Sequence, residues 1–108
     1  MKGISKAEEM VLLAVWRLGD EANGVTIRRQ ILKSAGKNYT YGTLYGLLRQ
    51  MDRKGYLRRA KAEPLPKRGG RAKSYFKITP SGTRALKEAI ELHQLVWKNI
   101  DALSLGKP

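Results

Sequence analysis

The feature that most constrains the fold is a pair of strand-like segments in a chain whose other patterned segments are helical. The segments are YLRRAKA, residues 56–62, and KSYFKIT, residues 73–79. In the second, apolar and polar side chains alternate with the period of two that is typical of a strand. Between them, EPLPKRGGRA contains two prolines, two glycines and three basic residues, a composition that favours a turn. We therefore expect a two-stranded hairpin with a protruding basic tip, that is, a wing.

The first helix is predicted from residue 6 to residue 18. Ser5 and Glu8 have the spacing of a capping box, and Gly19 is expected to end the helix. Residues 10–16 are apolar on nearly every side of the helix. Because one small core cannot cover such a surface, we expect part of this helix to contact another chain.

A second helix is predicted from residue 25 to residue 35, after the turn GDEANG. Its apolar residues are expected to face the core: Val25, Ile27, Ile31 and Leu32. Its basic residues are expected to face outward, where they either contact phosphates or remain solvated: Arg28, Arg29 and Lys33. The segment SAGKNYT then interrupts the helical pattern.

A third helix is predicted from residue 41 to residue 54, with Thr40 or Thr43 as its N-cap and Gly55 as its end. At about 100° per residue, one face of this helix is apolar and the opposite face is not. The apolar face holds Leu44, Leu47, Leu48 and Met51. The opposite face holds Gly42, Gly46, Arg49 and Arg53. The outward face is thus bare in its N-terminal half and cationic in its C-terminal half.

The two glycines need an explanation, because each lowers helix stability by about 1 kcal/mol relative to alanine. In a helix-turn-helix protein the N-terminal part of the second helix enters the major groove. Bare positions at Gly42 and Gly46 would let the backbone approach DNA, so that Tyr41, Thr43 or Tyr45 reaches a base or a phosphate. Alternatively, Gly42 merely precedes a helix that begins at Thr43, and Gly46 is a tolerated surface residue.

The last helix is predicted from residue 80 to about residue 103, with Thr79 as N-cap and Pro80 as the first helical residue. Four large apolar residues and one histidine step by four and three as in a coiled-coil seam: Leu86, Ile90, His93, Trp97 and Ile100. We expect a second copy of the chain to cover this seam, although packing on the first helix of the same chain is an alternative.

Together these elements predict a mainly α fold with a small β-wing. It is a winged helix-turn-helix plus a long C-terminal dimerisation helix. Residues 1–79 would form the DNA-binding domain and residues 80–108 the dimerisation helix.

The position of the charge indicates the partner. The chain of 108 residues has 22 Lys and Arg, 9 Asp and Glu and a net charge of +13. Residues 28–77 contain fifteen of the basic residues and two of the acidic ones, so this region carries the whole excess. A central region of this kind is expected to bind a polyanion, and the helical context favours double-stranded DNA.

Other classes of function are disfavoured by the composition. There is no cysteine and only His93 as histidine, so neither a disulfide framework nor a metal site is expected, and no cofactor is implied. No recognisable catalytic motif is present, and the chain is not expected to be an enzyme. The longest apolar run is too short to cross a membrane, which favours a cytoplasmic protein without a membrane partner.

Two stretches resemble a known family. YTYGTLYGLLRQMDRKGYL, residues 39–57, and KRGGRAKSYFKITPSGTRALKE, residues 67–88, are similar to the PadR family of bacterial transcriptional regulators. Relatives share a G-T-L-Y helix, a G-R wing and a strand that ends in T-P-x-G, in that order. The resemblance implies a homodimeric repressor that binds an inverted-repeat operator. It also implies that the dimer forms between the C-terminal helix and the partner's N-terminal helix.

Positions are assigned to DNA partly from the residues and partly from this resemblance. The recognition helix would contribute Tyr41, Gly42, Thr43, Tyr45, Gly46 and Arg49. The wing would contribute Lys67, Arg68, Gly70, Arg71 and Lys73. Relatives often have proline where this chain has Gly46, so a base contact at that position is not implied.

The resemblance also implies a small aromatic effector that binds near the dimer interface. The residues expected at the dimer or effector site are Trp16, Leu86, Ile90, His93, Trp97 and Ile100. The alternative for Trp97 and His93 is a buried interface tryptophan beside a hydrogen-bonded histidine.

Two other functions are consistent with part of the sequence. The same charge would suit an RNA-binding or ribosome-associated module, but most of the aromatic residues lie in helices rather than on a sheet where single-stranded RNA could stack. A winged-helix adaptor for other proteins would not need so basic a surface.

Overall fold

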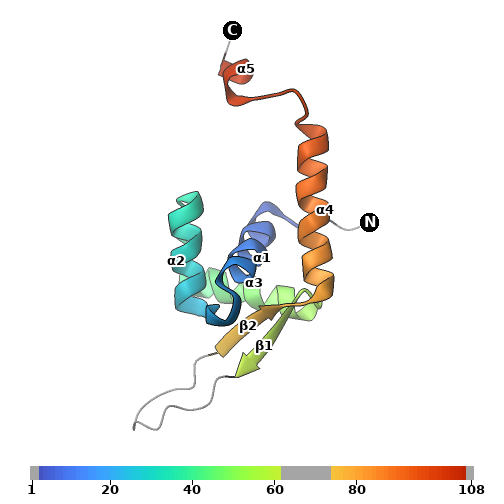
Figure 1. Ribbon diagram of the computed structural model, residues 1–108. Helices are drawn as coiled ribbons and strands as arrows, with labels where there is room; N and C mark the ends of the chain where they lie inside the picture. Colours follow the sequence, from blue (N-terminus) through green and yellow to red (C-terminus); the bar gives the residue numbers. More distant parts are fainter. Residues whose placement is uncertain (1–2, 62–73, 107–108) are drawn as a thin grey trace.

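The computed structural model describes residues 3–61 and 74–106. In chain order the elements are α1 (Lys6–Leu18), the short 3-10 helix η1 (Gly19–Glu21), α2 (Gly24–Ala35), α3 (Tyr41–Arg53), β1 (Leu57–Lys61), β2 (Ser74–Ile78), α4 (Pro80–Val96) and α5 (Ala102–Gly106). Figure 1 shows α1, α2 and α3 gathered above the β1–β2 ribbon, with α4 along one side. The prediction of a mainly helical winged fold is confirmed.

The helix ends follow the capping residues. The Ser5 hydroxyl accepts a hydrogen bond from the Glu8 N–H, and the Glu8 carboxylate accepts one from the Ser5 N–H, so the predicted capping box is present. Thr40, rather than Thr43, caps α3 by accepting from the Thr43 N–H at 3.1 Å. Gly55 follows the end of α3 with a φ of +79°, a conformation that favours glycine.

The core lies where α1, α2 and α3 meet the wing and the start of α4. Its largest fully buried side chains are Leu12, Ile27, Ile31, Leu44, Leu48, Met51, Leu57, Val11 and Val15. Three of them, Leu44, Leu48 and Met51, form the inner face of α3 as predicted. Since these side chains are completely buried, the rotation of α3 about its axis is determined, and its opposite face must point to solvent.

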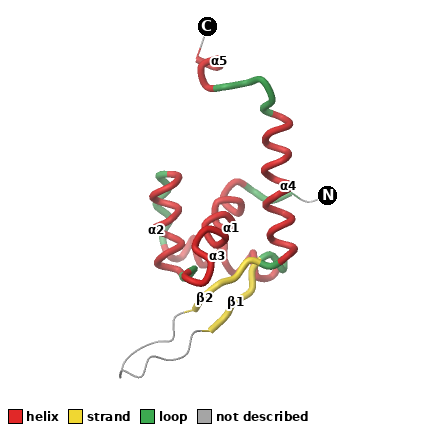
Figure 2. Tube along the Cα trace, in the orientation of Figure 1, coloured by secondary structure: helices red, strands yellow, loops and turns green. Residues whose placement is uncertain are grey.

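The wing is a two-stranded antiparallel sheet in which Leu57 pairs with Ile78 and Lys61 pairs with Ser74 (Figure 2). Its β2 strand also joins the turn after α1, because the Phe76 N–H donates to the Ala22 carbonyl at 2.9 Å. With Phe76 only 5% exposed, the base of the wing is attached to the helical core. The wing's orientation is therefore tied to that of the helices.

The T-P-S-G sequence, residues 79–82, has structural roles at the start of α4. Thr79 caps the helix, and Pro80 occupies its first turn. A Cβ on Gly82 would overlap the backbone carbonyl oxygen of Tyr56. Glycine is therefore required for α4 to pack this closely against the chain that enters β1.

Two expectations about the helices were wrong. Val25 and Leu32 are 47% and 42% exposed rather than buried. At 3.6 residues per turn they lie roughly 140–160° around α2 from Ile27, and the core covers only the Ile27 side.

The C-terminal helix also differs from the prediction. It ends at Val96 instead of continuing to residue 103, and a separate short helix, α5, follows. Trp97 closes α4 by donating its N–H to the His93 carbonyl, and Asn99 adopts a φ of +65°, which asparagine tolerates better than most residues. Ile100 of the expected seam thus lies beyond α4.

Candidate nucleic-acid interface

The helix-turn-helix is formed by α2, the connection through residues 36–40, and α3. Gly36 ends α2 with a φ of +69°, and its N–H donates to the Leu32 carbonyl. Thr40 then starts α3. This short connection presents the N-terminal half of α3 on the surface, as a helix-turn-helix reader requires.

The outward face of α3 is open at the predicted positions. A Cβ placed on Gly42 or Gly46 would meet no atom within 4 Å outside the helix itself. Thr43 is exposed in the first turn of the helix, and Arg49 is exposed in its C-terminal half. Gly42 lies inside α3, so the alternative in which the helix begins after it is wrong. Near its N-terminal end this face of α3 has no charge and lacks side chains at the two glycines, and it becomes cationic at Arg49.

Two tyrosines border this face. Tyr41 and Tyr45 are 43% and 37% exposed, and their ring centroids are 6.4 Å apart. The ring of Tyr45 lies over Gly24 at the start of α2, where any Cβ would overlap the tyrosine hydroxyl. Tyr45 is therefore located by α2, with only part of its ring free to meet a ligand.

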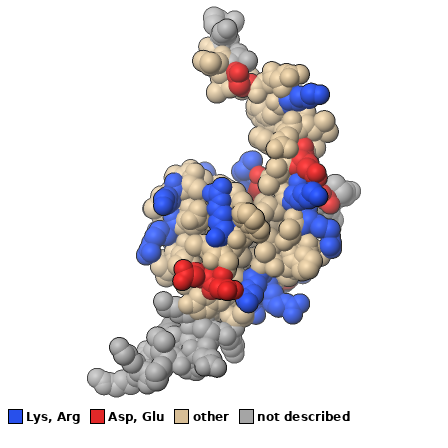
Figure 3. Space-filling view, in the orientation of Figure 1, with Lys and Arg blue, Asp and Glu red and all other residues tan. Residues whose placement is uncertain are grey.

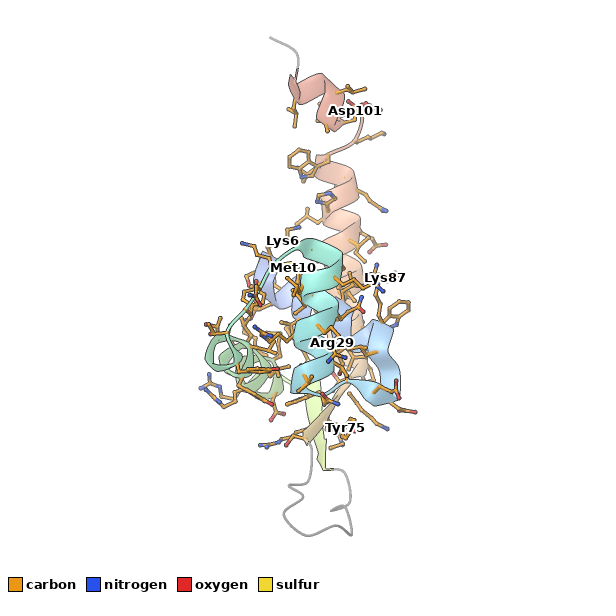
Figure 4. The ribbon with its side chains drawn as sticks, turned by 90° about the vertical axis from the view of Figure 1, so that its left-hand side faces the viewer. Lys6, Met10, Arg29, Tyr75, Lys87 and Asp101 are labelled. Atoms are coloured by element: carbon orange, nitrogen blue, oxygen red, sulfur yellow. The ribbon has the colours of Figure 1, made fainter. Side chains whose placement is uncertain are left out.

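The basic residues of the described surface differ in whether their side chains donate hydrogen bonds to other parts of the chain. Figure 3 shows Lys and Arg side chains over α2, whereas basic and acidic side chains are interspersed along α4. Figure 4 looks onto α2, with Arg29 on the side that faces the viewer. Arg28, one residue earlier, donates hydrogen bonds to the chain between α2 and α3 instead of pointing freely to solvent.

Glu8 links α1 to the C-terminal end of α3, a contact that the sequence did not predict. One carboxylate oxygen accepts from the Ser5 N–H, and the other accepts from Gln50 at 2.6 Å and from the Lys54 ammonium at 2.7 Å. Burial alone would raise the pKa of this carboxyl, since its side chain is 3% exposed. The hydrogen bonds from Lys54, Ser5 and Gln50 together with the Lys54 charge outweigh that effect, and the pKa of Glu8 is lowered. Lys54 is thus held by α1.

The strands of the wing carry basic residues along the ribbon. Arg59 donates two hydrogen bonds to the Ser74 hydroxyl, at 2.7 and 3.2 Å, across the ladder. Arg58 pairs in register with Lys77, so cations lie opposite each other on the two strands. The tip residues predicted to contact DNA lie outside the described part of the chain: Lys67, Arg68, Gly70, Arg71 and Lys73.

The residues expected at a dimer or effector site do not lie in one place. His93 and Trp97 stack with centroids 5.7 Å apart and line a cavity of about 360 Å³ between the N-terminal segment, α1 and α4. Trp16, 58% exposed, is not among the residues that line it. Ile90 and Ile100 are 40% and 46% exposed.

Leu86 does not belong to an exposed seam. It is 6% exposed within the core of its own chain, because the first turns of α4 pack on the three-helix unit. The exposed apolar residues of α4 lie nearer its C-terminal end: Ile90, Leu92, Leu95 and Val96.

Sequence reasoning missed two interactions here, the Glu8 bridge to α3 and the Arg28 contacts. The sequence predicted Glu8 as part of a capping box, but the hydrogen bonds from Gln50 and Lys54 to its carboxylate span 42 and 46 residues. A pattern read along one helix cannot predict a contact across the core.

Within the described residues, no helix is both long and apolar enough to cross a bilayer.

Comparison with known proteins places this geometry in a family. The model of the transcriptional regulator PadR-like family matches residues 12–88. No curated protein sequence shows significant similarity to the chain.

Solved structures share the fold. A PadR family transcription regulator from hypervirulent Clostridium difficile aligns with a TM-score of 0.75 and 18% identity, over 87% of this chain and 93% of that one. A winged-helix DNA-binding protein from STIV gives 0.71 and 20%, over 93% and 100%. A transcriptional regulator from Clostridium thermocellum gives 0.70 and 22%, over 84% and 85%. At these identities the likeness establishes the fold.

Proposed function

Because the chain belongs to the PadR-like family of transcriptional regulators, we propose that it is a homodimeric repressor that reads an inverted-repeat operator in double-stranded DNA through α3. Family membership and the winged-helix fold define the general activity, regulation of transcription, and members of the family are not enzymes. The oligomeric state, the sign of regulation, the operator and the contacting residues are parts of the proposal.

The observation that carries the proposal is the outward face of α3. Gly42 and Gly46 leave space on it, while Tyr41, Thr43 and Arg49 surround that space. A bare helix surface can enter the major groove deeply, and hydroxyl, phenol and guanidinium groups offer donors for base edges and phosphates. Tyr45, held against α2, would define one edge of the contact.

The wing is proposed as a second contact. Lys67, Arg68, Gly70, Arg71 and Lys73 would bind phosphates or enter the adjacent minor groove, where guanidinium groups are favoured. Their strands already bring Arg58, Arg59 and Lys77 to the same ribbon. Phosphate contacts of this kind make affinity strongly dependent on salt.

We propose that residues 80–108 form the dimer contact together with α1. Leu92, Leu95 and Val96 are 59%, 71% and 65% exposed, and exposed apolar surface of this extent is typical of a protein interface. Trp16 on α1 offers a similar surface. A second copy that covers both would present two α3 helices to one duplex.

The cavity beside His93 and Trp97 is the proposed effector site. Its volume of about 360 Å³ suits a small planar molecule, and the stacked pair provides an aromatic wall. Trp97 fluorescence should change when a phenolic acid or another planar aromatic binds. Replacing Trp16 by Phe would leave Trp97 as the sole reporter, and unchanged fluorescence with a broad panel of aromatics would contradict this part.

The test of the DNA-binding proposal is a selection of bound fragments from a random duplex library, followed by gel shifts. The selected duplex should be retained in the presence of excess nonspecific DNA and of RNA. It should contain two inverted half-sites whose centres lie about one helical turn, roughly 10 bp, or a multiple of that, apart. Preference for RNA, or equal competition by any duplex, would contradict the proposal.

A further inference from the structure

Arg28 occupies an unusual position between the two helices of the helix-turn-helix. Its Nε donates a hydrogen bond to the Tyr39 carbonyl at 2.6 Å, and a terminal nitrogen donates to the Asn38 side-chain oxygen at 2.8 Å. Both acceptors lie in the connection that leads into α3. Two bonds from one planar group determine where that connection lies relative to α2.

The same guanidinium lies over an aromatic ring of α3. Its central carbon is 4.8 Å from the centroid of the Tyr41 ring, a distance typical of a cation–π contact. Tyr41 is the first residue of α3, and its ring is 6.4 Å from that of Tyr45 one turn later. Arg28 thus acts on the ring that begins the proposed DNA-reading face.

The other tyrosine is supported by the same helix. Tyr45 lies over Gly24, where a side chain would overlap it, and Gly24 is four residues before Arg28. Residues four apart lie on one face of a helix. One face of α2 therefore supports both tyrosines, with a glycine beneath Tyr45 and a guanidinium beside Tyr41.

We propose that Arg28 is a positioning residue for DNA recognition, which holds Tyr41, and through it the edge formed with Tyr45, in the orientation that selects particular bases. The inference rests on the proposed function, because it assumes that the outward face of α3 reads DNA. It assigns Arg28 to specificity rather than to phosphate binding. Its neighbour Arg29, exposed on α2 and without these contacts, offers the matched comparison.

The first experiment separates charge from geometry. Arg28→Lys keeps the positive charge but loses the planar fork, and Arg29→Lys is the control. Affinity is measured for the selected duplex and for a scrambled duplex over a range of salt concentrations. We expect Arg28→Lys to lower the ratio of specific to nonspecific affinity about tenfold, with an unchanged salt slope on the scrambled duplex. Arg29→Lys should leave the ratio unchanged.

The second experiment tests whether Arg28 acts through Tyr41. In a double-mutant cycle with Arg28→Ala and Tyr41→Ala, the arginine change should reduce the specificity ratio in the wild-type background and have no further effect once Tyr41 is absent. If Arg28→Ala does not fold, the cycle is run with Arg28→Lys, whose thermal unfolding is compared with that of the wild type.

Four outcomes are informative. A specificity ratio that Arg28→Lys leaves unchanged would overturn the inference, as would additive effects in the cycle. Parallel loss of specific and nonspecific affinity in Arg28→Ala, with full rescue by lysine, would instead identify a phosphate contact and also overturn it. If the wild-type protein prefers no duplex at all, the proposed function fails first, and this result is distinguishable because it precedes any substitution.

Discussion

At the scale of single residues, the glycines of α3 are the most informative positions. Gly46 has an ordinary helical backbone and open space around it, so nothing in the fold requires the missing side chain. Gly82 differs, because the Tyr56 carbonyl occupies the place of its Cβ. The open space around Gly46 fits the proposed approach of DNA and also the alternative of a tolerated surface residue, and a substitution distinguishes the two.

Replacing Gly46 by Gln should therefore separate stability from function. We expect the free energy of unfolding to rise by up to about 1 kcal/mol, because glycine is the poorer helix former. The affinity for the selected duplex should fall at least tenfold, because the added side chain holds α3 away from the bases. Urea unfolding and gel-shift titration measure the two quantities.

Gly19→Ala provides the control for this change. Gly19 ends α1, outside the helix-turn-helix, and its φ of +59° makes alanine unfavourable by about 1–3 kcal/mol. Stability should fall and operator affinity should stay the same at temperatures where the protein is folded. Unchanged operator affinity in Gly46→Gln, with the expected gain in stability, would contradict the role assigned to the glycine.

At the scale of elements, the successes and failures of sequence reasoning have a common cause. The N-terminal ends of α1, α3 and α4 were predicted closely because Ser5, Thr40 and Thr79 act on backbone groups within three residues. Local chemistry of this kind is visible in a sequence.

The failures concern what covers a helix. Val25 and Leu32 were assigned to the core by their residue type, yet the core reaches only the opposite side of α2. After α4 ends, Asn99 adopts a positive φ. The apolar spacing on both sides of this residue had predicted a continuous helix instead. For the site, the outward face of α3 followed from periodicity, whereas the Arg28 and Glu8 contacts needed the three-dimensional arrangement.

Glu8 gives a prediction about how α1 holds α3. Its pKa is lowered, so folding favours the ionised carboxylate, and this stabilisation is present above the ordinary pKa of a glutamate. The stabilisation decreases as the pH falls below the ordinary glutamate pKa. It is gone once the pH is below the lowered pKa of Glu8 in the folded protein. At neutral pH, Glu8→Gln should reduce the free energy of unfolding by about 1–3 kcal/mol, since charged hydrogen bonds are removed.

The measurement is urea unfolding of wild type and Glu8→Gln between neutral pH and about pH 3, a range that spans the ordinary carboxyl pKa. The difference between the two proteins should shrink as the solution becomes acidic. Glu9→Gln is the control, because Glu9 pairs with Lys6, whose side chain is 66% exposed, and such pairs contribute little. A stability difference that does not change with pH would show that the Glu8 charge is not what stabilises the contact.

At the scale of the whole molecule, the most basic elements and the most exposed apolar side chains of α4 are separated. Basic residues outnumber acidic ones in α2, α3 and the wing strands, while Leu92, Leu95 and Val96 lie at the far end of α4, which extends away from the other helices in Figure 1. This separation would allow one end of the chain to bind a second copy while the other end binds DNA. A symmetric dimer would then place two α3 helices on one side of a duplex.

Removing apolar surface from α4 should therefore break the assembly without unfolding the chain. Leu92→Ser with Val96→Ser changes two side chains that are 59% and 65% exposed, so stability of the single chain should change by less than about 0.5 kcal/mol per site. Sedimentation equilibrium should show a mass reduced to that of one chain, and the affinity for the complete operator should fall toward that for a half-site.

The matched control replaces Lys87 and Glu91, exposed polar residues of the same helix, by Ser. It should leave the dimer intact. A double variant of Leu92 and Val96 that remains dimeric would place the interface elsewhere on the molecule.

The central claim is that two copies of α3 read the major groove of one duplex, and footprinting on the selected operator tests it most directly. Hydroxyl radicals and dimethyl sulfate report backbone and major-groove contacts separately. We predict two protected segments on the same side of the duplex, about 10 bp apart or a multiple of that, each with protected guanine N7 atoms at its centre. A single protected segment, or protection of the backbone with every guanine N7 still reactive, would contradict the account.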